Sequence, residues 1–258
     1  MDFSKPKIMG ILNITPDSFS DGGKYISDFE SQISNLIEQG ADIIDVGGES
    51  TGPGSKDVSL EEELSRVKPV IDYISENKLT DKVLFSIDTY KAEVAEYALK
   101  NGFKMINDVT ALRGDPDMLN TLNLYKPYII IMYSKDSTPR TTTESVEYDD
   151  VIASIKTFLV ERISVLVQAG FSEDKIIIDP GMGMFVSANP KYSFEIIERL
   201  SELKQLGYPI LVGVSRKSFL GGDIKDRDFL STEYSKKAIQ NGASIVRVHD
   251  IALIRKVI

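Results

Sequence analysis

Four polar side chains each follow a short apolar run with the pattern of a β-strand: Asp88, Asn107, Asp179 and Lys217. A carboxylate accepts two parallel N–H hydrogen bonds, an amide both donates and accepts, and a lysine donates to a carbonyl or ring nitrogen. Together these groups suit a flat heterocycle with a guanidine-like edge and a keto group. Each residue alone has a purely structural explanation, but all four together favour a binding site.

A second set of polar residues, Asn13, Arg247 and His249, lies on the first and the last apolar run. An arginine, a histidine and an amide together are suited to holding phosphate. A single histidine, as in this chain, more often has a structural role. Here the "RVH" spacing places Arg247 and His249 on the same side of a strand, which favours the functional interpretation.

Other residues near the same runs have less specific patterns. Ser215, in "VSRKSFLGG", is expected to cap a helix whose free N–H groups attract an anion, or else to be an ordinary N-cap beside a solvated Arg-Lys pair. Asp45 and Asp108 are each equally well explained as helix caps or as parts of the site. Ser59 and Glu62 have the spacing of a capping box.

Strand and helix patterns alternate along the whole chain. We predict strands over 7–13, 41–48, 82–89, 103–109, 127–133, 175–181, 208–215 and 243–250. The intervening periodic segments predict helices over 28–40, 59–75, 91–102, 115–122, 148–170, 190–207, 231–242 and from 251 onward.

Eight such units in 258 residues predict an α/β fold, a single-domain (β/α)8 TIM barrel over residues 1–258, with an open doubly wound sheet as the alternative. In a barrel all strands end at one face, so the polar residues above are expected to meet there.

Composition narrows the classes of function. The chain has no cysteine, which excludes disulfides and thiolate chemistry. The net charge of −9 argues against a nucleic-acid partner, although a local cluster of donors can still hold a phosphorylated small molecule. No apolar run approaches the roughly 20 residues that span a bilayer, so we expect no membrane association and a cytoplasmic location.

The ordered set of motifs resembles the dihydropteroate synthase family of the folate pathway. The motifs are "MGILNITPDSFSDGG", "ADIIDVGGEST", "SIDT", "INDV", "DPGMG", "LVGVSRKSFLG" and "VRVHD". The resemblance implies a (β/α)8 barrel that joins 6-hydroxymethyl-7,8-dihydropterin pyrophosphate to para-aminobenzoate and releases pyrophosphate. It also implies Mg²⁺ as cofactor and a homodimer.

The resemblance further assigns roles to residues. The pterin would be held by Asp88, Asn107, Asp179 and Lys217. Pyrophosphate would be held by Asn13, Arg247 and His249, with Asn13 as the metal ligand. Thr51, Ser215 and Phe19 would lie on the aminobenzoate side, with the loop "TPDSFSDGG" (15–23) closing over the site. The catalytic set implied is Asn13, Asp88, Lys217, Arg247 and His249.

Three positions depart from the family pattern: Gly52 replaces an arginine, Tyr133 a histidine, and Met184 an aromatic residue. We expect these changes to affect the aminobenzoate side, giving either weaker affinity or a different arylamine. Two alternatives are a pterin-dependent methyltransferase, which shares the barrel and the pterin pocket but has no need for the "SRKS" and "RVH" positions, and a pterin-binding protein that lost catalysis through the loop changes.

Overall fold

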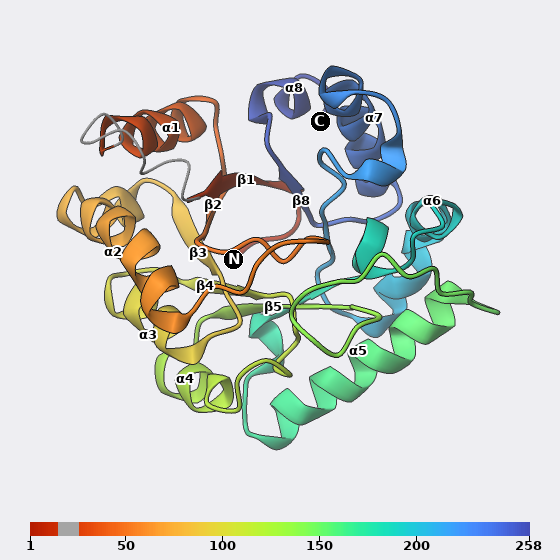
Figure 1. Cartoon of the computed structure of the whole chain (residues 1–258), viewed down its shortest axis with the longest axis horizontal. Coiled ribbons are helices and arrows are strands. Elements are labelled where there is room, and N and C mark those ends of the chain that lie inside the picture. The colour runs from red at the N-terminus through yellow and green to blue at the C-terminus, as the bar shows by residue number, and fades with distance from the viewer. Residues whose placement is uncertain (15–25) are drawn as a thin grey trace.

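The computed structural model describes residues 1–14 and 26–258. In this part of the chain eight parallel strands form the inner ring seen in Figure 1. They are β1 (Lys7–Asn13), β2 (Ile43–Gly47), β3 (Leu84–Asp88), β4 (Met105–Asp108), β5 (Tyr128–Met132), β6 (Ile176–Asp179), β7 (Leu211–Val212) and β8 (Ile245–Val248).

The strand order closes the sheet into a barrel. Hydrogen-bonded neighbours run β6-β5-β4-β3-β2-β1-β8-β7. A parallel bridge between Ile178 and Ile210 joins the two remaining edges, supported by a 2.9 Å hydrogen bond from Ile178 N to the Pro209 carbonyl. The single-domain (β/α)8 prediction is confirmed, and the open sheet is wrong.

Helices surround the strands on the outside of the barrel (Figure 1). They are α1 (Ile26–Glu38), α2 (Leu60–Glu76), α3 (Ala92–Lys100), α4 (Met118–Tyr125), α5 (Val151–Gln168), α6 (Lys191–Glu198), α7 (Ile224–Gln240) and α8 (Ile251–Arg255). Ser59 caps α2 by accepting a hydrogen bond from Glu62 N at 3.2 Å, as its position predicts. No helix in the two described segments is both long and apolar enough to cross a membrane.

Three elements differ from the sequence prediction. The segment 190–207 is not one α-helix, because α6 ends at Glu198 and a 3-10 helix follows over Leu200–Leu206. Its apolar residues Leu200, Leu203 and Leu206 recur every three residues, which is the period of a 3-10 helix. β7 has only two residues, and α7 begins earlier than predicted, at a capping box formed by Asp223 and Asp226.

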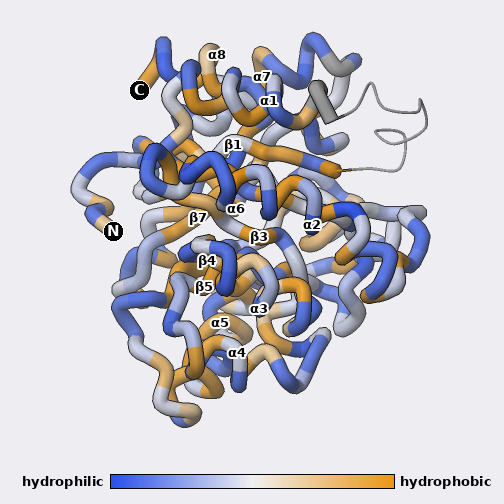
Figure 2. Tube along the Cα trace, turned by 90° about the vertical axis from the view of Figure 1, so that its left-hand side faces the viewer, coloured by the Kyte–Doolittle hydropathy of each residue, from blue (hydrophilic) through white to orange (hydrophobic). Residues whose placement is uncertain are grey.

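The interior of the barrel is apolar toward the amino ends of the strands and polar at their carboxyl ends. Side chains alternate across a strand, so every second residue points inward. Toward the amino ends of the strands the interior is filled by a buried cluster of Met9, Ile43, Met105, Ile130, Ile177, Leu211 and Ile245. Figure 2 shows hydrophobic residues running through the middle of the molecule, where the strands lie. The polar site begins on the carboxyl side of this cluster.

Candidate active site

A cavity at the carboxyl ends of the strands brings together all four residues expected to hold a heterocycle. Its lining is Thr51, Asp88, Asn107, Val109, Met132, Asp179, Met182, Phe185, Gly213, Lys217 and Arg247. Strand register explains the convergence, because Asn13, Gly47, Asp88 and Asn107 pair in one row across β1 to β4. Because these strands end at the same height along the barrel axis, their last inward-facing residues point into the same cavity.

The floor of this cavity is a buried ionic network. Arg247 donates from Nε to Asp45 Oδ2 and from Nη2 to Asp88 Oδ2, both at 2.7 Å. Asn107 Nδ2 also donates to Asp45 Oδ2, at 2.9 Å, so its amide oxygen remains available as an acceptor. Asp45 is fully buried, and this pairing offsets the cost of burying its charge. Asp45 is therefore no helix cap but the support of two cavity residues.

Asp108, the other possible cap, has a local structural role. Its Oδ1 accepts from the backbone and hydroxyl of Thr110, and its Oδ2 accepts from Leu112 N at 2.8 Å. These bonds organise the turn that follows β4, well before α4 begins. Asp108 does not line the cavity.

Burial shifts the pKa of the ionisable cavity residues. It raises the pKa of Asp88 to about 7, opposed by Arg247 and reinforced by repulsion from Asp45. Burial likewise raises the pKa of Asp179 to about 6, while its hydrogen bond with Gly181 N and the positive Lys217 act in the other direction. Burial lowers the pKa of Lys217 to about 8, although Asp179 attracts its proton. Such shifts are typical of functional sites.

Two tight turns direct Asp179 and Lys217 into the cavity. Asp179 Oδ1 accepts from Gly181 N at 2.7 Å. Gly181 has φ +69°, and a Cβ there would lie 2.4 Å from the Tyr133 carbonyl oxygen, so this turn requires glycine. Arg216 is left-handed at φ 57°, an uncommon conformation outside glycine that reverses the chain just before Lys217.

Lys217 lies over an aromatic ring that the sequence did not single out. Its Nζ is 4.8 Å from the centre of the Phe185 ring and donates to the Met182 carbonyl at 3.1 Å. The ring and the ammonium thus form one wall of the cavity. A flat ligand could pack against this apolar wall while its polar edge meets the carboxylates.

A second cavity adjoins the first. It is lined by Asn13, Gly47, Glu49, Ser50, Thr51, Gly52, Asp88 and Arg247. Thr51, Asp88 and Arg247 line both cavities. A ligand with two parts could therefore place its ring in the first cavity and its polar substituent in the second.

His249 is oriented by Ser215. The Ser215 hydroxyl accepts from His249 N at 3.2 Å and lies 2.9 Å from His249 Nδ1. Burial, helped by Arg216 and Arg247, lowers the pKa of His249 to about 4, so the ring is neutral near pH 7. The neutral ring carries one N–H, and its tautomer decides whether Nδ1 accepts from the Ser215 hydroxyl or donates to it. The prediction that Ser215 caps a helix is wrong.

Comparison with known proteins now identifies the family. The family model described as "Pterin binding enzyme" matches residues 9–249. The dihydropteroate synthase of Streptococcus pyogenes serotype M3 is 43% identical over 252 residues, which cover 95% of this chain and 90% of that protein. The chain belongs to the dihydropteroate synthase family.

Solved dihydropteroate synthases share the fold over the whole chain. The Xanthomonas albilineans enzyme with 4-aminobenzoic acid has a TM-score of 0.89 and 37% identity, covering 99% of this chain and 92% of that one. The same organism's enzyme in complex with 7,8-dihydropteroate has a TM-score of 0.85 and 35% identity, covering 100% and 92%.

Of the three departures from the dihydropteroate synthase pattern, Tyr133 lies outside the site. It follows Met132, which faces inward, so alternation turns the tyrosine outward. Its ring meets Phe158 of α5 edge-on at 5.3 Å, and its hydroxyl lies 3.0 Å from that of Tyr148. The expectation that Tyr133 alters the aminobenzoate side is wrong.

Gly52 and Met184 remain near the cavities. Gly52 lines the second cavity, and a Cβ built there would meet only Ser50 Oγ, at 3.7 Å. The Met184 carbonyl accepts from Thr141 Oγ1 at 2.7 Å, while the next residue, Phe185, supplies the aromatic ring of the first cavity.

Some expected residues fall elsewhere or outside the description. Phe19 and the loop 15–23 of the dihydropteroate synthase pattern lie outside the described residues. His249 is placed beside Ser215 but lines neither cavity. Sequence reasoning did not single out Met132 and Phe185, which line the first cavity. Strand alternation was the signal available for Met132, which is two residues after the inward-facing Ile130.

Proposed function

We propose that this protein condenses 6-hydroxymethyl-7,8-dihydropterin pyrophosphate with para-aminobenzoate, giving 7,8-dihydropteroate and pyrophosphate for folate biosynthesis. The observation that carries this proposal is the meeting of Asp88, Asn107, Asp179 and Lys217 in one cavity of a chain from the dihydropteroate synthase family. The related enzyme solved with 7,8-dihydropteroate supports the product, and the one solved with 4-aminobenzoic acid supports the second substrate.

The pterin would occupy the first cavity. Asp179 in its ionised form accepts N–H bonds from the amidine-like edge of the pterin. Asn107 offers its free amide oxygen, because Asp45 holds the amide nitrogen. Lys217 donates to the keto group or a ring nitrogen and lies over Phe185, which packs against the ring.

The reaction needs a stabilised leaving group more than a strong base. The C–O bond to the pyrophosphate breaks, and the bonding electrons leave with the phosphate oxygen. The nitrogen of the arylamine forms the new bond to the methylene carbon and then loses a proton. Arg247 lines both cavities and would donate to the departing oxygens, with His249, two residues further along the chain, as a second donor.

Mg²⁺ would bind between Asn13 and the pyrophosphate. The described residues contain no group of three acidic, histidine or cysteine side chains suited to a metal. Mg²⁺ nevertheless commonly uses one or two protein oxygens together with substrate phosphates. Asn13 lines the second cavity together with Asp88, so its amide oxygen is available for that role. When bound, the ion would neutralise charge on the leaving pyrophosphate.

The decisive assay measures pyrophosphate release from the full chain with Mg²⁺, with the two substrates together and each alone. We expect release only when both are present and a product with the mass of 7,8-dihydropteroate. Pterin binding without release would mean a non-catalytic pterin-binding protein. Release with another member of an arylamine panel, but not with para-aminobenzoate, would mean a different second substrate.

The rival methyltransferase reaction has a separate readout. A pterin-dependent methyltransferase would demethylate a methylated pterin in the presence of a corrinoid acceptor and would release no pyrophosphate. We also propose that the protein is a homodimer, as the family resemblance implied, and that it is cytoplasmic, as expected from its sequence. Sedimentation velocity tests the assembly, and cell fractionation tests the location.

A further inference from the structure

Arg140 joins two loops that are far apart in the sequence. It lies between β5 and α5, and its guanidinium forms ion pairs with Glu49 and Asp57 of the loop between β2 and α2. Its Nη2 also donates to the Lys56 carbonyl at 2.9 Å. One side chain thus contacts the beginning and the end of the loop that carries Thr51 and Gly52.

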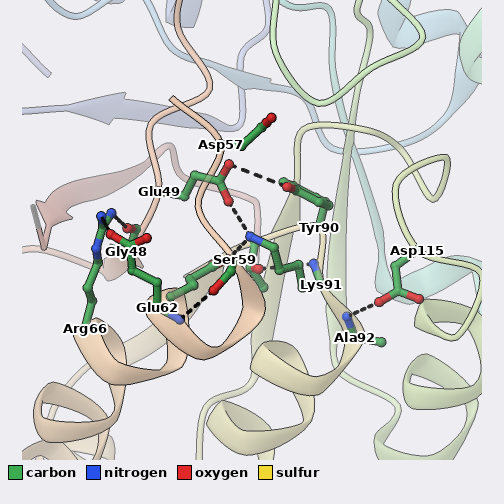
Figure 3. A network of polar contacts seen from close by, with 12 residues as sticks. Gly48, Glu49, Asp57, Ser59, Glu62, Arg66, Tyr90, Lys91, Ala92 and Asp115 are labelled. Carbon is green, nitrogen blue, oxygen red and sulfur yellow. Dashed lines mark hydrogen bonds and ion pairs between the residues drawn. The ribbon is translucent and has the colours of Figure 1, made fainter. Parts of the chain in front are cut away.

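The carboxylate of Glu49 lies between two cations. Lys91, at the start of α3, forms an ion pair with Glu49 on one side and another with Glu63, at 2.5 Å, on the other. Figure 3 shows Glu49 directed toward Lys91 and Tyr90, whose hydroxyl lies 3.5 Å away. The Glu49 side chain is only 3% exposed, so its contacts are shielded from water and more effective than surface pairs. We call Arg140, Glu49, Lys91, Glu63 and Asp57 the Arg140 cluster.

The residue after Arg140 extends the link to the first cavity. Thr141 N donates to the Thr51 carbonyl at 3.2 Å, and Thr141 Oγ1 donates to the Met184 carbonyl at 2.7 Å. Thr51 lines both cavities, and Phe185 beside Met184 lines the first. Residues 140 and 141 therefore connect the β2–α2 loop with the segment after β6.

The β2–α2 loop depends on such outside support because it has little of its own. Gly52 contributes no side chain, and a Cβ there would contact only Ser50. Within the loop, Ser55 bonds the Gly52 carbonyl through its N at 3.2 Å and its Oγ at 2.7 Å. A glycine gives the disordered states of a loop more backbone conformational entropy, which is lost when the loop is ordered. Ordering Thr51 therefore requires contacts from outside the loop.

We propose that Arg140 is a positioning residue for the second substrate: through Glu49 it fixes the β2–α2 loop and so places Thr51 at the junction of the two cavities. This inference rests on the proposed function. Arg140 lines neither cavity, so it acts through the loop and not by contact with the pterin. Asn107 on β4 and Asp179 on β6 would hold the pterin, and neither belongs to the Arg140 cluster.

The test compares four substitutions of the full-length protein, two at Arg140 and two controls. Arg140→Ala should raise the KM for para-aminobenzoate by about tenfold or more, the effect of losing one charge-assisted hydrogen bond. Pterin affinity, measured by calorimetric titration, should change by less than about twofold, because Asp88, Asn107, Asp179 and Lys217 are not partners of Arg140 and Thr51 is the one lining residue of the first cavity that this loop supplies. Arg140→Lys, which keeps the charge, should restore part of the KM.

Two control variants separate positioning from general stability. Arg199→Ala removes an arginine that pairs with Asp150, Glu195 and Glu202, none of which lines either cavity, so KM should not change. Asp57→Asn removes the partner whose side chain is 93% exposed, so it should have little effect. A KM in Arg140→Ala equal to that of Arg199→Ala would overturn the proposal.

Hydrogen exchange gives a second readout that needs no activity. Amides of residues 51–57 should exchange faster in Arg140→Ala than in Arg199→Ala, while amides of the barrel strands remain equally protected. Unchanged exchange in this loop would also overturn the proposal. If the unsubstituted protein released no pyrophosphate, the proposed reaction would fail, yet the exchange comparison would still decide whether Arg140 orders the loop.

Discussion

Arg247, on the last strand, is held by Asp45, a fully buried carboxylate on the second strand, with 2.7 Å between Nε and Oδ2. The same guanidinium contacts Asp88 and lines both cavities. A residue expected to serve pyrophosphate alone therefore also supports the pterin cavity. This double role makes the consequences of substitution at 247 different from those at 249.

Arg247→Ala should destabilise the protein as well as weaken pyrophosphate binding. It leaves the buried Asp45 without its cation, and breaking a buried pair costs roughly 3–5 kcal/mol. The double variant Asp45→Asn with Arg247→Ala should recover stability but not binding. His249→Ala should weaken binding with little loss of stability. Urea unfolding and inhibition by pyrophosphate with Mg²⁺ measure both effects, and an unfolding free energy unchanged by Arg247→Ala would contradict the role of the pair.

Asp179→Asn should abolish pterin binding and yet stabilise the free protein near neutral pH. The pKa of Asp179 is raised to about 6 in the folded state, so folding favours its protonated form. The stability that this provides is present below the unfolded pKa and is lost as pH rises through about 6.

The advantage of Asp179→Asn should therefore appear between about pH 4 and pH 6 and persist above it, with an upper limit of about 3 kcal/mol for the two-unit shift. Thermal unfolding across this range, without ligand, measures the difference. Equal stability of the two proteins at pH 7 would show that the charged carboxylate is well compensated.

Pterin affinity should be highest between about pH 7 and pH 8, because the pKa of Asp88 is raised to about 7 and Asp88 is protonated below it. Below this window Asp179, with a pKa of about 6, becomes protonated and loses acceptor capacity. Above it Lys217, with a pKa of about 8, loses its charge. Titration with an unphosphorylated pterin avoids the ionisation of phosphate. The alkaline limb should be absent in Lys217→Met; an alkaline limb that persists in this variant would assign that titration to the ligand.

Gly52→Arg should lower the KM for para-aminobenzoate. The backbone at Gly52 is not in the left-handed region, and there is open space beyond its Cα, so a side chain is sterically allowed. An arginine would bring donors to the second cavity that glycine lacks. Gly52→Ala is the control, since it stiffens the loop without adding a donor. Steady-state kinetics in which both variants match the unsubstituted protein would show that another residue already supplies this interaction.

The barrel and the four polar residues of its first cavity were predictable from local sequence patterns. The alternation of strand and helix patterns was sufficient for the fold because each pattern reflects local periodicity. Asp88, Asn107, Asp179 and Lys217 were identifiable because strands that run in parallel end at one face. The 3-10 helix after α6 also has a local signal, the three-residue spacing of Leu200, Leu203 and Leu206, although the helical periodicity of the whole segment 190–207 obscures it.

The contacts between particular side chains could not be predicted from local sequence patterns, because they depend on the tertiary structure. Asp45 and Arg247 are 202 positions apart, and closure of the barrel brings them into contact across β1. Tyr133 was assigned to the wrong side because a one-residue step along a strand reverses its direction, and register is a property of the whole sheet. No strand pattern or motif singled out Arg140. Its partners belong to another loop, and pairing between loops depends on how the barrel positions them.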